Sequence, residues 1–295
     1  MSDFVQQQNS ISDFATSDSW VILSPIEQSI KKKIEAVGTP LKDWDINIYR
    51  GVLTGCNEAF IIDSEKRDEI LANCKTEDER QRTAELIRPI LRGRDIKRYG
   101  YDWANLWLIY IPWHFPYQFD DSIQGASEKA EKAFKEQYPA VYSHMLQYKE
   151  PLSKRNKAET GIRYEWYAMQ RWGAKYWDLF FQPHICWKAV GRNLAFALVE
   201  SGVFLTAPAS FISGGVYNET ILHYLCSKVG TYFIYKNSDT TGAGDIMLNI
   251  QSLIKFPVPV GKLETEGLSY NEINNAIYIT YGFTNAEIAY IESQI

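Results

Sequence analysis

The chain has 295 residues, which is enough for one large domain or two modest ones. An apolar fraction of 45% is ordinary for a protein with a buried core, and a net charge of −5 excludes a uniformly basic surface but not a local basic groove. No apolar run approaches the length of a membrane span, and the polar amino terminus has no signal-peptide pattern. The 4 cysteines stand far apart without a Cys-x-x-Cys pair, which favours free thiols in a reducing cytoplasm over a zinc site.

The first part of the chain is predicted to be a polar tail followed by a helix. Residues 1–19 are rich in Ser, Gln and Asp, so we expect a flexible linker or tail, with order beginning at Trp20. A capping box with proline at the first helical position covers residues 24–27. Apolar residues then recur at helical spacing until Gly38, so the pattern predicts a helix that ends there.

Residues 47–63 are predicted to form a strand, a tight turn and a second strand. Two short apolar runs flank a segment with two glycines, and glycine permits the positive φ angles of tight turns. Taken alone, the pattern favours an ordinary hairpin. The turn also carries polar side chains that suit a phosphate or a base edge, namely Arg50, Thr54 and Asn57.

The middle of the chain is predicted to be mainly helical. Helices are expected at 65–72, from Thr76 to the residue before Pro89, at 127–137 and from Pro139 to about residue 149, with a strand at 106–111. Residues 88–100 are neither amphipathic nor alternating, which predicts a loop or a broken turn. Residues 112–121 form an aromatic loop, and residues 151–175 show no clear preference.

The last third alternates short strands with helices. Strands are expected at 185–189, 194–199 and 203–207, where they would form a meander that is followed by a turn at 210–215. A helix is then expected from Asn218 to about Val229, followed by a strand at 232–235 and a polar loop at 236–245. The chain is expected to end with a strand within 246–258 and two helices. The whole pattern predicts an α+β fold with a mixed, mainly antiparallel β-sheet and flanking helices.

Positive charge is concentrated in two stretches, 80–100 and 149–175, and aromatic residues are interleaved with the second. On an acidic protein, such clusters are typical of a nucleic-acid groove, where Lys and Arg neutralise phosphates. Two solvated faces held by local ion pairs are the alternative, although the predominance of arginine in the first stretch counts against it. The basic residues are Arg80, Arg82, Arg88, Arg92, Arg94, Lys97 and Arg98, then Lys149, Lys154, Arg155, Lys157, Arg163, Arg171 and Lys175.

Catalytic motifs are absent from the sequence. It has no Asn-Pro-Pro-Tyr segment, no Gly-x-Ser-x-Gly elbow, no dinucleotide fingerprint and no Walker loop. The glycine-bearing segment 241–245 is the nearest match to an S-adenosylmethionine turn, but no helix is predicted after it. The residue types of a metal-dependent nuclease site, two acids and a lysine, are present in Asp78, Asp95 and Lys97, but their spacing in the sequence is loose. We therefore expect no catalytic or metal-binding residue, and a binding function.

Several segments, taken in order, resemble one known family. They read IYRGVLTGCNEAFIID, LIRPILRGRDIKRYGYDWANLWLIYIP, YPAVYSHMLQYKEPLSKR, YEWYAMQRWG and YITYGFTNAEIAYIE. They are similar to the TaqI-like specificity domain, the carboxy-terminal target-recognition domain of adenine-specific DNA methyltransferases and type IIG restriction–modification enzymes. The resemblance covers residues 20–295, which are therefore expected to form one DNA target-recognition domain.

The resemblance implies double-stranded DNA and a methyltransferase, with or without a nuclease, as partners. An upstream catalytic domain would hold S-adenosylmethionine, and Mg²⁺ where it also cleaves, and would methylate an extruded adenine at N6. Residues 1–19 would then be the remnant of a linker. The DNA-facing candidates that the resemblance and the basic stretches imply are Arg50, Thr54, Asn57, Arg92, Arg94, Lys97, Arg98, Arg155, Arg163, Trp166 and Arg171.

Two alternatives stay open from the sequence. The basic stretches could dock the methyltransferase or nuclease subunit, so that DNA is contacted only in the assembly. The second alternative is a stand-alone metal-dependent nuclease whose activity depends on Asp95.

Overall fold

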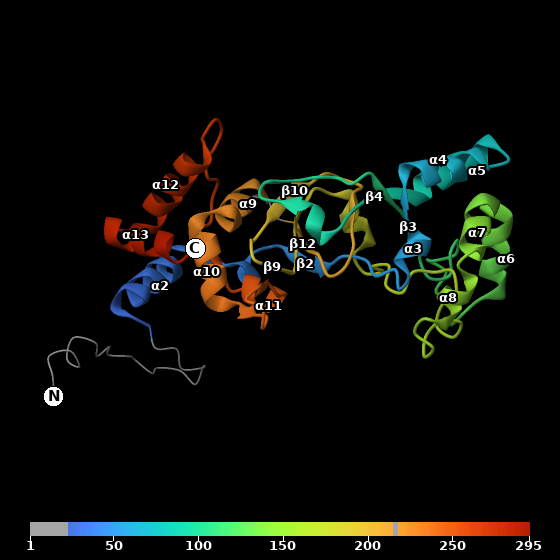
Figure 1. The fold of residues 1–295 in the computed structure, drawn as a ribbon, viewed down its shortest axis with the longest axis horizontal. Coiled ribbons are helices and arrows are strands. Elements are labelled where there is room, and N and C mark those ends of the chain that lie inside the picture. Colours follow the sequence, from blue (N-terminus) through green and yellow to red (C-terminus); the bar gives the residue numbers. More distant parts are fainter. Residues whose placement is uncertain (1–22, 215–217) are drawn as a thin grey trace. The chain divides into compact units, whose positions relative to one another are not determined.

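The structure, a computed structural model, describes residues 23–214 and 218–295. The chain divides into two compact units (Figure 1): unit 1 joins the residues up to Ile46 with those from Gly215 onward, and unit 2 is Asn47–Gly214. The expected recognition domain, residues 20–295, includes residues of both units. The predicted tail at 1–19 lies outside the described residues. None of the helices in the described ranges is both long and apolar enough to cross a membrane.

Unit 1 is mainly helical. Its helices are α2 (Pro25–Val37), α9 (Asn218–Cys226), α10 (Lys228–Asn237), α11 (Ile250–Leu253), α12 (Tyr270–Tyr281) and α13 (Asn285–Ser293), with a short 3-10 helix η1 (Leu41–Asp43). Two antiparallel strand pairs accompany them: β1 (Thr39–Pro40) with β15 (Pro257–Val258), and β13 (Asp239–Thr240) with β14 (Ile246–Met247).

Side-chain caps fix the ends of these helices. The predicted capping boxes are present at the starts of α2 and α13, where Ser24 pairs with Glu27 and Thr284 with Glu287. Glu287 also accepts hydrogen bonds from Ser29 (2.6 Å) and Lys33 (2.7 Å) on α2, so one buried carboxylate joins two helices. The helical predictions at both ends of the chain are therefore confirmed.

Three predictions for unit 1 need correction. Residues 232–235, expected as a strand, lie inside α10, because Ser227 caps that helix by accepting a hydrogen bond from the Gly230 amide (3.0 Å). The same cap ends the preceding helix at Cys226 rather than near Val229. The strand expected within 246–258 is interrupted by α11, whose cap is Asn249.

Unit 2 contains two four-stranded sheets. The first has the order β10-β8-β12-β2 and is antiparallel throughout; the second has the order β11-β4-β7-β3, in which only β11 and β4 run parallel. The strands are β2 (Asn47–Arg50), β8 (His184–Trp187), β10 (Phe196–Val199) and β12 (Ser210–Ser213), then β3 (Ile61–Asp63), β4 (Ile87–Leu91), β7 (Leu106–Ile109) and β11 (Phe204–Leu205). Shorter strands are β5 (Ile96–Lys97), β6 (Gly100–Tyr101) and β9 (Val190–Gly191).

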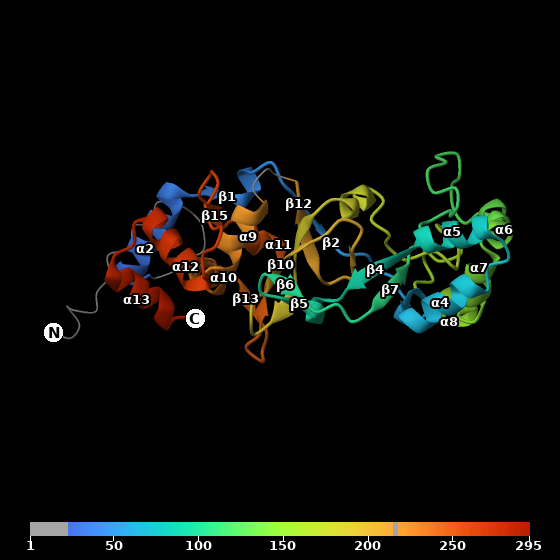
Figure 2. The ribbon, with the colours of Figure 1, turned by 90° about the horizontal axis from the view of Figure 1, so that it is seen from above.

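The helices of unit 2 gather beside the second sheet, as both ribbon views show (Figure 2). They are α3 (Asn57–Phe60), α4 (Ser64–Ala72), α5 (Glu77–Leu86), α6 (Glu128–Gln137), α7 (Pro139–Leu146) and α8 (Lys149–Lys154), with the 3-10 helices η2 (Gly93–Asp95) and η3 (Trp177–Phe181). The predicted α+β class with mainly antiparallel sheets is confirmed, as are the helices around residues 65–72, 77–86 and 128–146.

One aromatic cluster joins the two sheets of unit 2 into a single core. Phe180 of η3 stacks on Phe204 of β11, with ring centroids 4.4 Å apart, and lies 4.7 Å from Phe211 of β12. All three side chains are fully buried. The two sheets therefore support each other through η3.

Four further predictions for unit 2 were wrong, and all concern strand pairing. Residues 47–63 do not form a hairpin, since β2 pairs with β12, β3 pairs with β7, and α3 lies between them. Residues 88–100 hold β4, η2, β5 and β6 rather than a loop. The third strand of the expected meander, β11, joins the other sheet, and the expected turn at 210–215 is the inner strand β12. The pairings of β2 with β12, β3 with β7 and β11 with β4 join segments that are distant in the sequence, so local patterns do not specify them, whereas β5 and β6 form a local antiparallel pair.

Candidate nucleic-acid interface

The turn after β2 is held in place by Arg155, which lies at the end of α8. The Arg155 guanidinium donates hydrogen bonds to the backbone carbonyl oxygens of Thr54 and Ala168, and to those of Leu152 (3.1 Å) and Trp166 (2.9 Å). Burial lowers the pKa of Arg155, but the group stays cationic at neutral pH. We assign Arg155 to the support of the turn, because its donors are directed into the chain.

Within the turn, Thr54 is buried and Asn57 is exposed. The Thr54 hydroxyl donates a hydrogen bond to Asn57 Oδ1 (2.7 Å) and accepts one from the Cys56 amide (3.3 Å). Thr54 thus stabilises the turn, whereas Asn57, the first residue of α3, is exposed. Of the predicted contacts in this turn, Arg50 and Asn57 are the ones that a ligand can reach.

The second basic stretch is partly neutralised by Glu159. Arg171 donates two hydrogen bonds to its carboxylate (2.9 and 3.0 Å), and Arg163 donates one (3.0 Å). The hydrogen bond from Arg171 is the main reason that the pKa of Glu159 lies below its usual value. Two cations meet one anion here, so a positive charge remains on side chains that are 60% and 49% exposed.

Trp166 lies inside unit 2. Its side chain is 8% exposed, its indole nitrogen donates a hydrogen bond to Glu131 (2.7 Å), and the Lys149 ammonium lies 5.0 Å from its ring centroid. A ring in this position packs in the core and has no free face for a base.

Arg92 and Asp95 shape the loop of the first basic stretch. The Arg92 guanidinium forms a bidentate pair with the Asp95 carboxylate (3.0 and 2.8 Å), which also accepts a hydrogen bond from the Arg92 amide (2.8 Å). Burial acts to raise the pKa of Asp95, but the hydrogen bonds from Arg92 outweigh it and hold the pKa below its usual value. Asp95 is thus engaged in the loop, and in the described ranges no three His, Cys, Asp or Glu residues are grouped to hold a metal ion.

Three basic side chains of the same loop are exposed: Arg94, Lys97 and Arg98. Within the described part of the chain, the Arg94 guanidinium has no hydrogen-bond partner, and the Lys97 ammonium lies 3.6 Å from Asp102 in an open pair. Half-buried Lys188, which follows β8, lies against the loop, because a Cβ placed on Gly93 would be 3.2 Å from the Lys188 Cβ. We refer to Arg94, Lys97, Arg98 and Lys188 as the basic loop cluster.

A cross-strand row of the first sheet relates Arg50 to this cluster. Arg50 lies opposite Ser210, Ser210 opposite Trp187, and Trp187 opposite Phe196. The Phe196 carbonyl oxygen then accepts a hydrogen bond from the Tyr99 amide (2.8 Å), one residue beyond Arg98. With neighbouring strands about 4.8 Å apart, the two edges of the sheet are about 14 Å from each other, and the loop of the cluster lies one more spacing beyond β10, roughly 19 Å from β2.

Sequence patterns alone could not identify Lys188 as part of this cluster. It is a single lysine between an apolar strand and a short polar segment, and only the antiparallel pairing of β8 brings it to the loop. The residues of the first basic stretch on α5 lie elsewhere: Arg80 pairs with Glu77 (3.6 Å), and Arg82 donates to the Gln137 carbonyl (3.1 Å).

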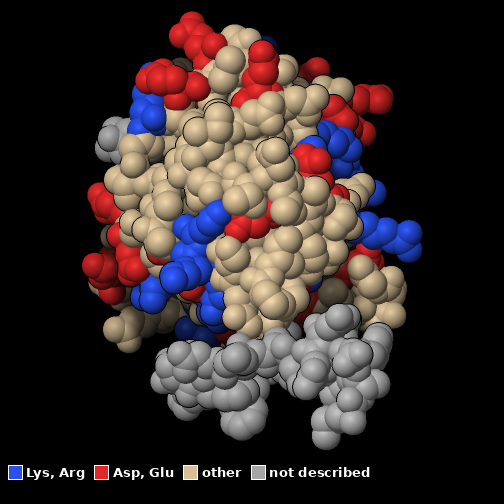
Figure 3. Space-filling view, turned by 90° about the vertical axis from the view of Figure 1, so that its left-hand side faces the viewer, with Lys and Arg blue, Asp and Glu red and all other residues tan. Residues whose placement is uncertain are grey.

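Unit 1 carries side chains of both charges. On the face that carries α2, α12 and α13, basic side chains gather in one patch beside a broad uncharged area, with acidic side chains around them (Figure 3). Three lysines of unit 1 are paired with carboxylates: Lys33 with Glu287, Lys228 with Glu292 and Lys236 with Glu27. The basic loop cluster of unit 2, where the Arg94 guanidinium has no such partner among the described residues, is therefore taken as the candidate interface.

The α+β fold is similar to that of specificity domains of restriction–modification enzymes. Residues 88–258 match the family described as the TaqI-like C-terminal specificity domain. The chain belongs to this family, which confirms the resemblance seen in the sequence.

Two solved structures of restriction–modification enzymes are similar to this chain. One is the type IIL restriction–modification enzyme MmeI in complex with DNA, with a TM-score of 0.53 and 12% identity over 86% of this chain and 36% of that one. Another is the type IIG restriction endonuclease BpuSI, with a TM-score of 0.46 and 14% identity over 88% of this chain and 28% of that one. The chain thus spans about a third of the length of these enzymes. No curated protein matches the sequence.

Proposed function

We propose that this chain recognises a short sequence in double-stranded DNA for a restriction–modification enzyme. It would position the duplex for N6-methylation of an adenine, and for cleavage where a nuclease is fused, by a catalytic domain that binds S-adenosylmethionine and Mg²⁺. The observation that carries the proposal is the basic loop cluster at one edge of a sheet, with Arg50 at the other edge. Family membership and the DNA complex of MmeI support the same role.

Arg50 and the loop of the cluster are separated by four strand spacings, roughly 19 Å, and a major groove is about 12 Å wide. Long basic side chains that flank such a groove can contact the phosphates of both strands, while Arg94 or Asn57 reaches base edges. We assign Arg92, Thr54 and Arg155 to the support of these contacts and Arg163 and Arg171 to a secondary basic surface.

The test is a salt titration of the whole chain with a pool of random-sequence duplexes, followed by sequencing of the bound fraction. Counterion release predicts that the logarithm of the affinity falls linearly with the logarithm of the salt concentration. The bound fraction is expected to be enriched in one short motif. Undetectable binding at low salt, or binding without enrichment, would show that the chain is not a self-sufficient sequence reader.

A second candidate function is docking of the catalytic subunit, with DNA bound only in the assembly. It is favoured by large apolar side chains exposed on unit 1, such as Ile279 (80% exposed) and Val260 (69%). Adding the catalytic subunit separates the two functions, because DNA binding that requires that subunit favours docking.

A further inference from the structure

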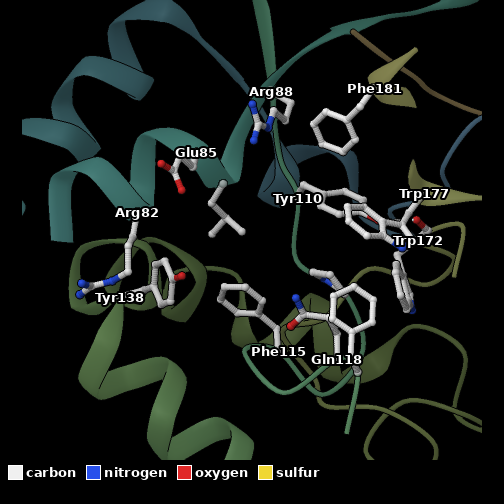
Figure 4. Close-up of a pocket in the computed structure, with 13 residues that line it drawn as sticks. Arg82, Glu85, Arg88, Tyr110, Phe115, Gln118, Tyr138, Trp172, Trp177 and Phe181 are labelled. Atoms are coloured by element: carbon white, nitrogen blue, oxygen red, sulfur yellow. Dashed lines mark hydrogen bonds between the residues drawn. The ribbon is translucent and has the colours of Figure 1, made fainter. Parts of the chain in front are cut away.

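A cavity of about 200 Å³ opens on unit 2, away from the basic loop cluster (Figure 4). Its walls come from α5, the end of β7, the aromatic loop after it, and η3. The aromatic side chains among its lining residues are Tyr110, Phe115, Phe119, Tyr138, Trp172, Trp177 and Phe181. Drug-sized ligands usually occupy cavities of about 300–1,000 Å³, so this one suits a single flat ring system.

The entrance of the cavity exposes an aromatic ring to solvent. Phe119 is 61% exposed, and its ring centroid lies 5.4 Å from that of Trp177 and 6.4 Å from that of Trp172. Tyr110, whose hydroxyl donates a hydrogen bond to the Trp172 carbonyl (2.9 Å), fixes the inner wall. Leaving Phe119 in water is unfavourable in the free protein, and a ring stacked against it would remove that cost.

Polar groups of both kinds face the cavity. The Arg88 guanidinium lies 5.1 Å from the Phe181 ring centroid, and among the described residues it has no hydrogen-bond partner. Gln118 Oε1 is buried and likewise lacks a partner in the described part of the chain. Figure 4 shows Arg88 and Gln118 on opposite sides of the cavity, with the Glu85 carboxylate on a third side. The cavity thus offers donors on one side and acceptors on the others.

This chemistry selects among flat ligands. A quaternary ammonium ion would suit the aromatic walls, but Arg88 and Arg82 place positive charge at the rim and disfavour a cation. A nucleobase stacks on aromatic rings whatever its sequence, and guanine combines acceptors at O6 and N7, which suit arginine, with amino and imino donors that suit Gln118 and Glu85.

We propose that this cavity binds one unstacked nucleobase, with guanine as the best fit. The base can come from a free nucleotide or from a DNA strand in which it is not stacked. The site is independent of the basic loop cluster, so this inference goes beyond the recognition of paired DNA and does not require it.

The first experiment measures binding of the four deoxynucleoside 5′-monophosphates to the whole chain by isothermal titration calorimetry, with deoxyribose 5-phosphate as the probe that lacks a base. Deoxyguanosine monophosphate is expected to bind most tightly and deoxyribose phosphate not at all. Binding of deoxyribose phosphate as strong as that of the nucleotides, or no binding of any nucleotide at millimolar concentration, would overturn the proposal. Equal affinity for all four nucleotides would overturn the preference for guanine.

Two variants test the cavity itself. Phe119→Ala removes an exposed ring, so the fold should persist while nucleotide affinity falls about 10-fold. Gln118→Met removes a buried acceptor without a partner, and should weaken nucleotide binding while thermal stability stays equal or rises. A purely structural role of Gln118 would lower stability and leave nucleotide binding unchanged, which contradicts the proposal. Arg94→Ala, in the basic loop cluster, should leave nucleotide binding unchanged.

The source of the base is decided by a pair of duplexes that differ at one position. One carries a guanine opposite an abasic site, and the other is fully paired. If DNA supplies the base, Phe119→Ala weakens binding of the first duplex about 10-fold and spares the second; if free nucleotides supply it, both duplexes are spared while monophosphate binding falls. Binding of nucleotides without binding of duplexes would support this site and contradict the proposed function. Binding of duplexes without binding of nucleotides would overturn this site and leave the proposed function intact.

Discussion

Arg155 donates a hydrogen bond to the carbonyl oxygen of Thr54, 101 residues earlier in the chain, and so connects the end of α8 to the turn after β2. Replacing Arg155 with leucine should lower the free energy of unfolding by about 3 kcal/mol, because several buried carbonyl oxygens would lose their donor. Urea denaturation followed by circular dichroism measures the change. Lys157→Ala, at an exposed position two residues on, should stay within about 0.5 kcal/mol. A loss below about 1 kcal/mol in Arg155→Leu would contradict the supporting role.

The Arg94 guanidinium is exposed and has no hydrogen-bond partner among the described residues, so it is available to DNA. Arg94→Ala should weaken duplex binding by about 1–3 kcal/mol and relax the preference at one base pair if Arg94 reads a guanine. Fluorescence anisotropy with the selected motif and its single-base variants measures both effects. Arg80→Ala, an exposed change on α5 outside the cluster, is the matched control and should have no effect. Loss of binding in Arg80→Ala with none in Arg94→Ala would place the interface on the helical side of unit 2.

Lys188 joins the basic loop cluster through strand pairing and is expected to contact a phosphate. Lys188→Ala should weaken binding to all duplexes equally and reduce the slope of log affinity against log salt by about 1. The measurement is a salt series with two unrelated sequences. Sequence-dependent loss would instead mark Lys188 as a base contact.

Glu287 links stability to pH. Burial acts to raise its pKa, but hydrogen bonds from Lys33, Ser29 and Thr284 prevail and lower the pKa to about 2. The unfolded chain therefore binds more protons than the folded one between the ordinary value of 4.5 and about 2. The contribution of Glu287 is fully present above pH 4.5 and is lost as the pH falls toward 2.

Glu287→Gln should remove this dependence and lower the free energy of unfolding at neutral pH by about 2–3 kcal/mol. Urea unfolding as a function of pH measures it, with Glu266→Gln as the exposed control. A variant that keeps the slope of the wild type in the acidic window would show that other carboxylates produce it.

Gly51 lies where β2 ends and the chain passes the backbone of Leu205 and Thr206. A Cβ on Gly51 would overlap the Leu205 carbonyl group, so Gly51→Ala should cost about 2 kcal/mol or more in thermal or urea unfolding. Gly100→Ala, which meets no atom within 4 Å, should change stability by less than about 0.5 kcal/mol. Similar effects of the two substitutions would mean that backbone entropy, and not the close approach, determines the cost.

Features encoded over a few residues could be predicted from the sequence. The caps at Ser24, Thr76 and Thr284 identify helix starts because one side chain and one nearby amide suffice to form them. Strand partners could not be predicted, since β2 finds β12 more than 150 residues later through pairing that local alternation does not specify. For this reason the expected hairpin and meander were wrong although their strands exist.

From the sequence, the candidate site could be predicted only as a stretch rich in basic residues. Basic residues at 92–98 indicated positive charge, but sequence could not distinguish Arg92, which pairs with Asp95, from exposed Arg94. It also could not show that Arg155 is directed into the chain, because its acceptors are backbone carbonyls that every residue carries. Hydrogen-bond partners, which depend on tertiary structure, divide the supporting arginines from the accessible ones.

The acceptors of Arg155 are main-chain oxygen atoms, so the support that it gives does not depend on which side chains stand at those positions. Exposed neighbours whose side chains make no hydrogen bond within the turn can therefore vary while the path of the turn stays the same. The exposed side chains of this surface can change in sequence while the backbone contacts that support them stay the same. Combinatorial libraries that alter target preference would keep Arg155 and Gly51 constant and randomise the exposed positions around them.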